Sequence, residues 1–288
     1  MPTNEQRRAA AKRKLERRLA RQAERERRRK QLTIAGSVLG VVVAVAAGVG
    51  IYYLTRGDDS KNTAATQTPD ASLSSTPQAA PPAAPVAKAA NVTCTYRDGG
   101  EAAKPVQKPS QTEVGTQGQV AVTIDTNQGP IGLTLDNGES PCTVNSFVSL
   151  ANQHYFDGTP CHRLTTEGIK VLQCGDPSGT GRGGPGYAFD NEYPTDQYPQ
   201  DAPKPQPVLY KRGVVAMANA GPGTNGSQFF LVYGDSPLPP NYTIFGTIDD
   251  AGLQTLDKIA GAGLDDADQA AGDGKPKNPV TFDSVRVG

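Results

Sequence analysis

A run of 23 residues without a charge, from Leu32 to Leu54, most constrains how this chain can fold. The hydrocarbon core of a bilayer is about 30 Å thick, and about 20 residues of α-helix cross it. The run exceeds the apolar region of a cleavable signal peptide, which has about 7–15 residues. A buried helix of a soluble domain is the alternative, but such helices rarely lack charges over this length. The run therefore predicts a transmembrane helix over residues 32–54.

The charges on the two sides of this run have opposite sign. Residues 1–30 hold 13 Lys/Arg and 4 Asp/Glu, a net charge of +9, whereas residues 57–288 hold 15 and 25, a net charge of −10. Because positively charged flanks stay in the cytoplasm, we expect a single-pass cell-membrane protein with a basic cytoplasmic segment over 1–31 and an extracytoplasmic C-terminal part. The basic segment is either a topology determinant alone or also a contact for anionic lipid. No aromatic residues interleave its charges, so no nucleic-acid partner is expected.

The next segment has the composition of a spacer. Residues 57–118 contain seven prolines and one aromatic residue, Tyr96. Such a segment cannot bury enough apolar surface to offset its ordering entropy. We therefore expect a disordered, Pro/Ala/Ser/Thr-rich linker over 55–118 that holds the folded part off the membrane. Residues 119–288 contain 14 of the 17 aromatic residues and are long enough for one domain with its own core.

Residues 119–288 have mainly the patterns of short strands. Alternating apolar residues on both sides of residues 127–130 predict a β-hairpin. Further strands are expected over 213–218, 227–233, 242–248 and 280–287. The pattern is mainly β and indicates an antiparallel barrel or sandwich with helical covers.

Two short helices are expected in the same part of the chain. Ser140 followed by Pro141 is typical of a helix N-cap and first helical position. A second helix is expected over 251–260, capped by Asp249 or Asp250 and ended by Gly261.

Several motifs are weighed and set aside. Residues 179–184 match GxGxxG but lack the strand before and the helix after it that a dinucleotide site needs. His154 and His162 are the only histidines, no nucleophile-elbow motif accompanies them, and the paired CxxC spacing of zinc sites is missing. The sequence therefore predicts neither a cofactor nor a metal.

The four cysteines are Cys94, Cys142, Cys161 and Cys174. They follow the predicted transmembrane helix, on the side where disulfides persist. Three full pairings are possible, and the sequence does not choose between them. We expect one bridge among the last three cysteines.

Residues 213–230, GVVAMANAGPGTNGSQFF, closely resemble the signature of the cyclophilins, a family of peptidyl-prolyl cis/trans isomerases. YFDGT at 155–159, His162-Arg163, QCGD at 173–176 and Phe245-Gly246 follow in the order and spacing of that family. The resemblance covers 119–288, and the whole arrangement is similar to that of bacterial cyclophilins with a membrane anchor. It implies an eight-stranded antiparallel β-barrel capped by two helices, Pro-containing polypeptides as substrates, and folding of exported proteins as the role.

The resemblance also implies the site residues. Arg163 matches the catalytic arginine, because a fixed guanidinium can donate to the proline nitrogen or the carbonyl oxygen as the amide twists in the transition state. Phe230 would form an apolar pocket floor for the pyrrolidine ring. The substrate-binding residues implied are Val171, Gln173, Ala218, Asn219, Ala220, Gln228, Phe230, Leu238 and Tyr242.

The sequence departs from the family pattern at three places. The segment between Arg163 and Gln173 is longer than usual, so Lys170 and Val171, or Ile169, fall where pocket-lining Phe and Met are common. Pro237 and Tyr242 stand where many members have Trp and His, and this predicts weak cyclosporin binding. The segment 193–210, with five prolines, is an elaboration that is either a plain surface loop or a partner-binding site. The altered pocket wall favours a second hypothesis, a catalytically weak scaffold that binds Pro-containing segments, whereas the retained site residues favour the enzyme.

Overall fold

The structure of the chain, a computed structural model, describes residues 79–110, 112–198 and 206–288. The predicted basic segment over 1–31, the predicted transmembrane helix over 32–54 and the predicted linker up to residue 78 lie outside these ranges. Within them, no helix has the length and the apolar character that crossing a bilayer requires. The described residues all belong to one compact unit, Leu73–Gly288.

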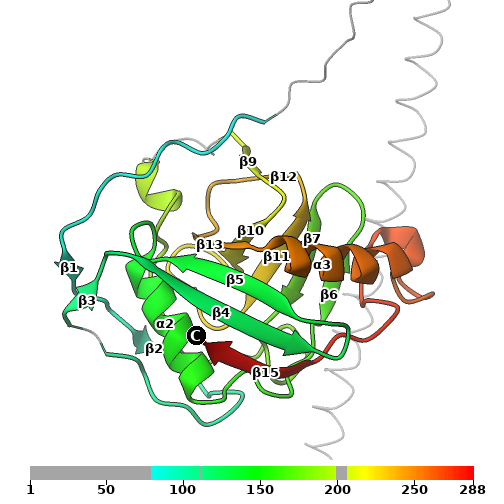
Figure 1. The fold of residues 1–288 in the computed structure, drawn as a ribbon, viewed down its shortest axis with the longest axis horizontal. Coiled ribbons are helices and arrows are strands. Elements are labelled where there is room, and N and C mark those ends of the chain that lie inside the picture. Colours follow the sequence, from blue (N-terminus) through cyan, green and yellow to red (C-terminus); the bar gives the residue numbers. More distant parts are fainter. Residues whose placement is uncertain (1–78, 111, 199–205) are drawn as a thin grey trace, which may run out of the picture. The chain divides into compact units, whose positions relative to one another are not determined.

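A curled antiparallel sheet of nine strands is the framework, in the order β14-β6-β7-β11-β10-β13-β5-β4-β15. The backbone N–H of Cys161 donates to the Val280 oxygen at 2.9 Å, so the segments that lead into β6 and β15 meet and the sheet curls towards a barrel (Figure 1). β14 adds a two-residue edge to the eight strands that were expected. The strands are β4 (Gln119–Thr126), β5 (Ile131–Asp136), β6 (Arg163–Thr165), β7 (Lys170–Cys174), β10 (Val214–Met217), β11 (Phe229–Gly234), β13 (Ile244–Ile248), β14 (Asp273–Gly274) and β15 (Phe282–Val287).

Three two-stranded sheets and two 3₁₀ turns accompany the main sheet. The sheets join residues far apart in the chain, and two of them use strands that precede residue 119. The pairs are β1 (Asn91–Val92) with β3 (Val114–Gly115), β2 (Arg97–Asp98) with β8 (Tyr187–Ala188), and β9 (Val208–Tyr210) with β12 (Ser236–Leu238); the turns are η1 (Thr195–Gln197) and η2 (Gln269–Ala271).

The strands predicted from alternation are confirmed. β4 and β5 form the predicted hairpin, with Ile124 opposite Ile131 across the turn. Gly129 in that turn has a φ of 129°, which favours glycine. The other predicted strands correspond to β10, β11, β13 and β15.

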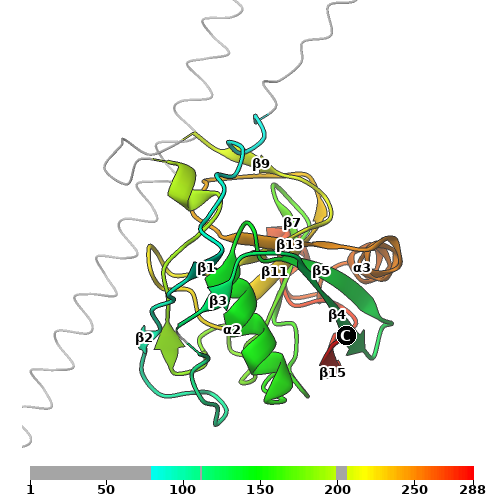
Figure 2. The ribbon, with the colours of Figure 1, turned by 60° about the vertical axis from the view of Figure 1, so that its left-hand side comes forward.

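Two helices lie on different sides of the curled sheet, α2 (Pro141–Asn152) and α3 (Asp250–Ala262) (Figures 1 and 2). Asp249 caps α3 as predicted, because its Oδ1 accepts the N–H of Gly252 at 2.6 Å. The predicted end at Gly261 is wrong by two residues. The chain leaves the helix at Gly263, where φ is 80° and a glycine avoids strain.

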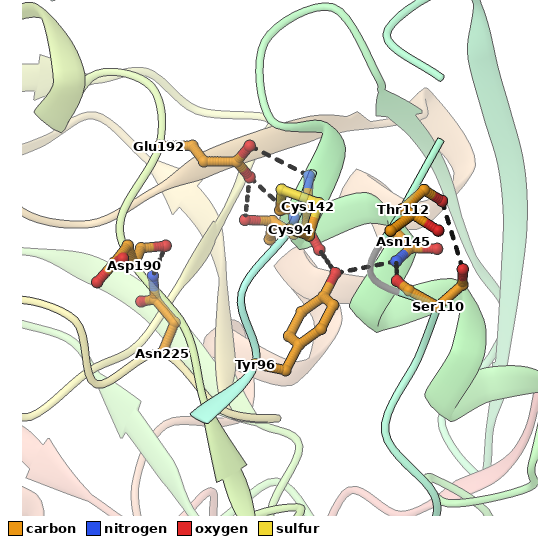
Figure 3. Close-up of a disulfide and its surroundings, with 10 residues drawn as sticks. Cys94, Tyr96, Ser110, Thr112, Cys142, Asn145, Asp190, Glu192 and Asn225 are labelled. Carbon is orange, nitrogen blue, oxygen red and sulfur yellow. Dashed lines mark hydrogen bonds between the residues drawn. A yellow bond between two sulfur atoms is a disulfide. The ribbon is translucent and has the colours of Figure 1, made fainter. Parts of the chain in front are cut away.

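The N-terminus of α2 is capped by a residue that the sequence did not indicate. Ser140 is at the N-cap position, but its hydroxyl donates to the Ile244 oxygen at 2.6 Å. Instead, the carboxylate of Glu192 accepts the backbone N–H groups of Cys142 at 3.1 Å and Thr143 at 2.8 Å (Figure 3). A carboxylate is favourable there, since a helix N-terminus carries partial positive charge. Local sequence could not reveal this long-range contact.

The core is aromatic. The ring of Phe147 on α2 lies 5.0 Å from Phe156 and 5.3 Å from Phe229, and Phe229 lies 6.5 Å from Phe245 and 6.1 Å from Phe282. These edge-on, tilted and stacked contacts add to the burial energy of each ring. The cluster fixes helix α2 against strands β11, β13 and β15.

The described residues of 79–118 differ from the expected disordered linker, because they pack on the curled sheet and its helix α2. Cys94 is bonded to Cys142 at the start of α2. The buried ring of Tyr96 packs 5.5 Å from Tyr187 and 5.6 Å from Phe189, and its hydroxyl donates to the Cys142 oxygen at 2.7 Å (Figure 3). A cross-link and one buried aromatic residue thus order a segment whose average composition favours disorder. We call residues 79–118 the extension.

The second disulfide joins Cys161 to Cys174. It confirms the expected bridge among the last three cysteines. Both cysteines lie next to strands of the candidate site, since β6 begins at Arg163 and β7 ends at Cys174.

The loop set aside as a dinucleotide motif wraps around Asp176. The buried carboxylate accepts the backbone N–H groups of Ser178 at 2.8 Å, Arg182 at 3.1 Å and Gly183 at 3.0 Å, and the Ser178 hydroxyl at 2.7 Å. Burial alone would raise the pKa of Asp176, but these donors outweigh it and the pKa is lowered.

Acid stability should therefore depend on Asp176. A pKa lowered in the folded state stabilises the fold above the unfolded value of about 3.9, and this contribution is lost as the pH falls through the folded pKa. We expect Asp176→Asn to lower the free energy of unfolding at pH 7 by about 3 kcal/mol and to flatten its decline below about pH 5. Urea unfolding between pH 3 and 7, with the exposed Asp283→Asn as control, measures both. An unchanged acid limb would contradict the role given to this carboxylate.

Candidate active site

Three predicted site residues stand side by side across neighbouring strands. Arg163 on β6 is directly opposite Gln173 on β7, and Gln173 is directly opposite Phe230 on β11. Residues directly opposite each other in an antiparallel sheet project from the same face. Strand register therefore places the guanidinium, the amide and the aromatic ring in one row.

This row lies in a pocket of about 510 Å³. The volume is in the usual range of small-molecule and peptide pockets, about 300–1,000 Å³. The structure brings eight of the ten predicted residues to this pocket: Arg163, Val171, Gln173, Ala218, Asn219, Phe230, Leu238 and Tyr242.

The pocket has an aromatic floor. Phe230 is nearly fully buried, and its ring packs edge-on against Tyr242 with 5.6 Å between centroids. Behind them, the hydroxyl of Tyr210 donates to the Tyr242 oxygen at 2.8 Å. Tyr210 belongs to β9, at the end of the proline-rich elaboration over 193–210, so this end supports the pocket floor, whereas residues 199–205 of the elaboration lie outside the described ranges.

The wall that departs from the family pattern is aliphatic. Ile169 and Val171 both line the pocket, whereas Lys170 does not. Lys170 instead donates from its Nζ to the Thr166 oxygen. The two alternatives from the sequence, Lys170 with Val171 or Ile169, thus contribute one residue each to the pocket, because residues two apart in an extended chain share a face.

A chain of hydrogen bonds connects the polar side chains. Nη1 of Arg163 donates to Oε1 of Gln173 at 3.2 Å, and Nε2 of Gln173 donates to Oε1 of Gln228 at 3.0 Å. Nε2 of Gln228 then donates to the Gly183 oxygen at 3.0 Å. Each amide is thereby fixed in orientation, which preorganises the polar side of the site.

Asn219 shapes the segment predicted to bind the substrate backbone. Its Nδ2 donates to the Asn241 oxygen at 2.8 Å, and its Oδ1 accepts the N–H of Gly221 at 3.1 Å. The side chain is thus used within its own loop and to hold the neighbouring loop that contains Asn241, so we expect any contact with substrate to come from the backbone.

Ala220 and Gln228, the other two predicted residues, line an adjoining pocket of about 630 Å³. The two pockets share Gln173, Ala218 and Asn219. Gly99 and Glu101 of the extension form part of the second pocket. The predicted site thus divides into two neighbouring hollows, and the extension borders one of them.

Five further residues line the first pocket without having been predicted from the sequence: His162, Thr180, Gly181, Asp273 and Gly274. Two of them, Asp273 and His162, have titratable side chains. The Asp273 carboxylate pairs with the Arg163 guanidinium, and this raises the pKa of the arginine and lowers that of the acid. Burial lowers the pKa of His162, which favours a neutral ring. No motif surrounds Asp273, so only its tertiary contact identifies it.

The described residues include no group of three or more His, Cys, Asp or Glu side chains placed to hold a metal ion. The pocket offers one guanidinium paired with the Asp273 carboxylate, the His162 imidazole, two side-chain amides and an apolar floor. Such a set can bind a small apolar ring and donate hydrogen bonds beside it.

The residues that line the pocket predict weak binding of cyclosporin. Leu238 and Tyr242 line it, and the chain has no tryptophan whose indole could donate to the drug. We expect calorimetric titration of residues 73–288 with cyclosporin to give a Kd in the micromolar range or weaker. A nanomolar Kd would contradict this expectation.

Comparison with known proteins agrees with this geometry. A model of the family described as "Cyclophilin type peptidyl-prolyl cis-trans isomerase/CLD" matches residues 121–287. The chain is 51% identical, over the full length of both proteins, to a probable peptidyl-prolyl cis-trans isomerase B of Mycobacterium leprae. It is 58% identical to the protein of the same name from Mycobacterium tuberculosis, over 72% of this chain and 68% of the relative. A probable isomerase A of M. leprae is 37% identical over 57% of this chain and 90% of its own length. The chain therefore belongs to the cyclophilin-type peptidyl-prolyl cis-trans isomerases.

Proposed function

We propose that this isomerase acts on exported proteins outside the cytoplasm, held at the membrane by residues 32–54, and that Arg163 is its catalytic residue. The observation that carries the catalytic part is the placement of the Arg163 guanidinium beside the apolar floor made by Phe230 in one pocket. The floor suits a pyrrolidine ring, and the guanidinium suits the amide next to it.

The chemistry follows from the amide bond. Resonance gives the C–N bond double-bond character and a rotational barrier of about 18–20 kcal/mol. At the twisted transition state the resonance is lost, and the proline nitrogen gains a localised lone pair. A donor aimed at that nitrogen or at the carbonyl oxygen is held more strongly there than in the planar ground state. Arg163 supplies such a donor, and no bond to the substrate is made or broken.

The aliphatic wall bears on substrate choice. Ile169 and Val171 give apolar surface without a polar side-chain atom, and Leu238 adds to the apolar lining of the same pocket. We propose that this wall holds the proline ring through contact area alone, and that the polar row from Arg163 to Gln228 orients the chain that precedes it.

The two disulfides support an extracytoplasmic location. Disulfides persist in oxidising compartments and are rare in the cytosol. All four cysteines of the chain are paired, as Cys94–Cys142 and Cys161–Cys174. The basic N-terminal segment and the uncharged run point to the same orientation. Contact between the basic segment and anionic lipid belongs to this proposal as well.

Protease protection tests the orientation. The full chain, tagged at its N-terminus, is expressed in a bacterium, and spheroplasts are treated with protease. We expect loss of the isomerase domain and protection of the tag. A protected domain with a digested tag would contradict the proposed orientation, and release of the chain by a carbonate wash would contradict the anchor.

A further inference from the structure

The catalytic-arginine candidate is clamped by a carboxylate that no sequence motif indicates. Nε of Arg163 donates to Oδ1 of Asp273 at 2.7 Å, and Nη2 donates to Oδ2 at 2.7 Å. The two parallel bonds are the planar, two-pronged geometry that arginine makes with carboxylates. Both residues line the same pocket.

The backbone holds Asp273 in this position. Strand β14 pairs with β6, with Asp273 opposite Thr165 and Gly274 opposite Leu164. The Thr166 N–H donates to the Gly272 oxygen at 2.8 Å, and Gly272 has a φ of 63°, which favours glycine. The carboxylate therefore comes from an ordered edge strand whose register with β6 is fixed.

The clamp leaves donors for the substrate. A guanidinium has five N–H groups. Asp273 takes two of them and Gln173 takes one, so two remain. The side chain is thus fixed on two sides, and its remaining donors are free to meet an amide in the pocket.

We infer that Asp273 is a positioning residue for X-Pro isomerisation, which acts by fixing the plane of the Arg163 guanidinium so that its remaining donors meet the twisted amide. This inference rests on the proposed catalytic role of Arg163. A donor fixed before the reaction needs no reorganisation during it, and a small misplacement of a catalytic group lowers the rate strongly.

Two other roles for the pair give different results. If the Arg163–Asp273 ion pair only stabilised the fold, its removal would change neither the isomerisation rate nor Tm by much. Exposed ion pairs contribute little to stability, and the side chains of Arg163 and Asp273 are 38% and 47% exposed. If the carboxylate restrained catalysis by neutralising the arginine, its removal would raise the rate.

The chain contains a matched control pair. Arg212 donates from Nη1 and Nη2 to both oxygens of Asp257, at 2.7 and 2.9 Å. Their side chains are 37% and 53% exposed, close to the values of the first pair. Neither residue lines the site pocket. Asp257→Ala therefore removes an equivalent ion pair without touching the site.

The test measures Asp273→Ala, Asp273→Asn and Asp257→Ala with a Pro-containing peptide by NMR line-shape analysis, which separates the on-enzyme isomerisation rate from the peptide Kd. We expect Asp273→Ala to lower the rate about ten-fold with Kd within about two-fold. Asp273→Asn keeps one acceptor oxygen, so its on-enzyme isomerisation rate should be only about three-fold below that of the wild type. Asp257→Ala should equal the wild type, and the Tm values should stay close together.

A second measurement reports on the Arg163–Asp273 hydrogen bonds and needs no turnover. ¹⁵N relaxation at the Arg163 Nε–H should report a rigid group in the wild type and a mobile one in Asp273→Ala, with S² below about 0.6. An Asp273→Ala variant with an unchanged or faster rate, or with a rigid Nε–H, overturns the inference. If Arg163→Ala also retains the wild-type rate, the proposed catalytic role of Arg163 has failed instead, and the two failures are thereby distinguished.

Discussion

Replacing Arg163 by alanine is expected to lower kcat/KM for X-Pro isomerisation by about 100-fold or more, which is the usual loss when one preorganised donor to a transition state is removed. The guanidinium lies in the pocket beside Phe230 and is held by Asp273 and Gln173. Peptide binding should change much less, because the apolar floor and wall remain. NMR exchange spectroscopy on an X-Pro peptide measures the loss without a coupled protease.

Two variants control for charge and for folding. Arg163→Lys keeps the positive charge but loses the planar fork, so we expect it to stay more than about ten-fold below the wild type. Arg212→Ala removes a comparable arginine outside the pocket and should retain full activity. An Arg163→Ala variant as active as Arg212→Ala would mean that the rate comes from the apolar pocket alone.

Removing the Cys94–Cys142 disulfide is expected to lower the free energy of unfolding by about 4 kcal/mol. The bridge spans 48 residues, and loop-closure entropy gives about 3 kcal/mol for 15 residues and about 4.7 kcal/mol for 100. The extension should then loosen, since only non-covalent contacts remain near the bridge: the Tyr96 ring against Tyr187 and Phe189, the Tyr96 hydroxyl bond to the Cys142 oxygen, and the short β2–β8 pair. Urea unfolding of Cys94→Ala/Cys142→Ala measures the change.

The second disulfide is a matched comparison. Cys161→Ala/Cys174→Ala opens a loop of 13 residues, for which about 3 kcal/mol is expected. Because Cys161 lies two residues before Arg163 and Cys174 directly follows Gln173 in β7, this variant should also lose turnover, whereas the Cys94–Cys142 variant should keep it for short peptides. The stability part of the account fails if both double variants unfold at the wild-type urea concentration.

The elements that could be predicted are those encoded by neighbouring residues. The hairpin of β4 and β5 follows from alternation, and the start of α3 follows from the Asp249 cap. The packing of the extension could not be predicted, because it depends on the choice of Cys142 as partner for Cys94 and on the burial of Tyr96. Composition is an average over a segment. It therefore does not reveal a single disulfide that lowers the conformational entropy of the entire segment.

The same distinction holds at the site. Residues within motifs, such as Arg163 and Phe230, could be placed from their order and spacing, and strand register brings them together. Asp273 and the Glu192 cap of α2 could not, since each acts through contacts to residues distant in the chain. Whether an acidic side chain is solvated or pairs with a distant group depends on the fold. The local sequence pattern around the residue therefore does not predict its partner.

The most direct test of the isomerase site is two-dimensional exchange spectroscopy on an X-Pro peptide with a catalytic amount of the compact unit, residues 73–288. The uncatalysed bond exchanges over tens to hundreds of seconds, so cross-peaks between cis and trans signals are absent on a mixing time of about a second. The account predicts strong cross-peaks on adding the protein, together with shift changes at Val171, Phe230 and Leu238. Shift changes at these residues without any exchange cross-peaks would contradict it and would favour a scaffold that binds proline without isomerising it.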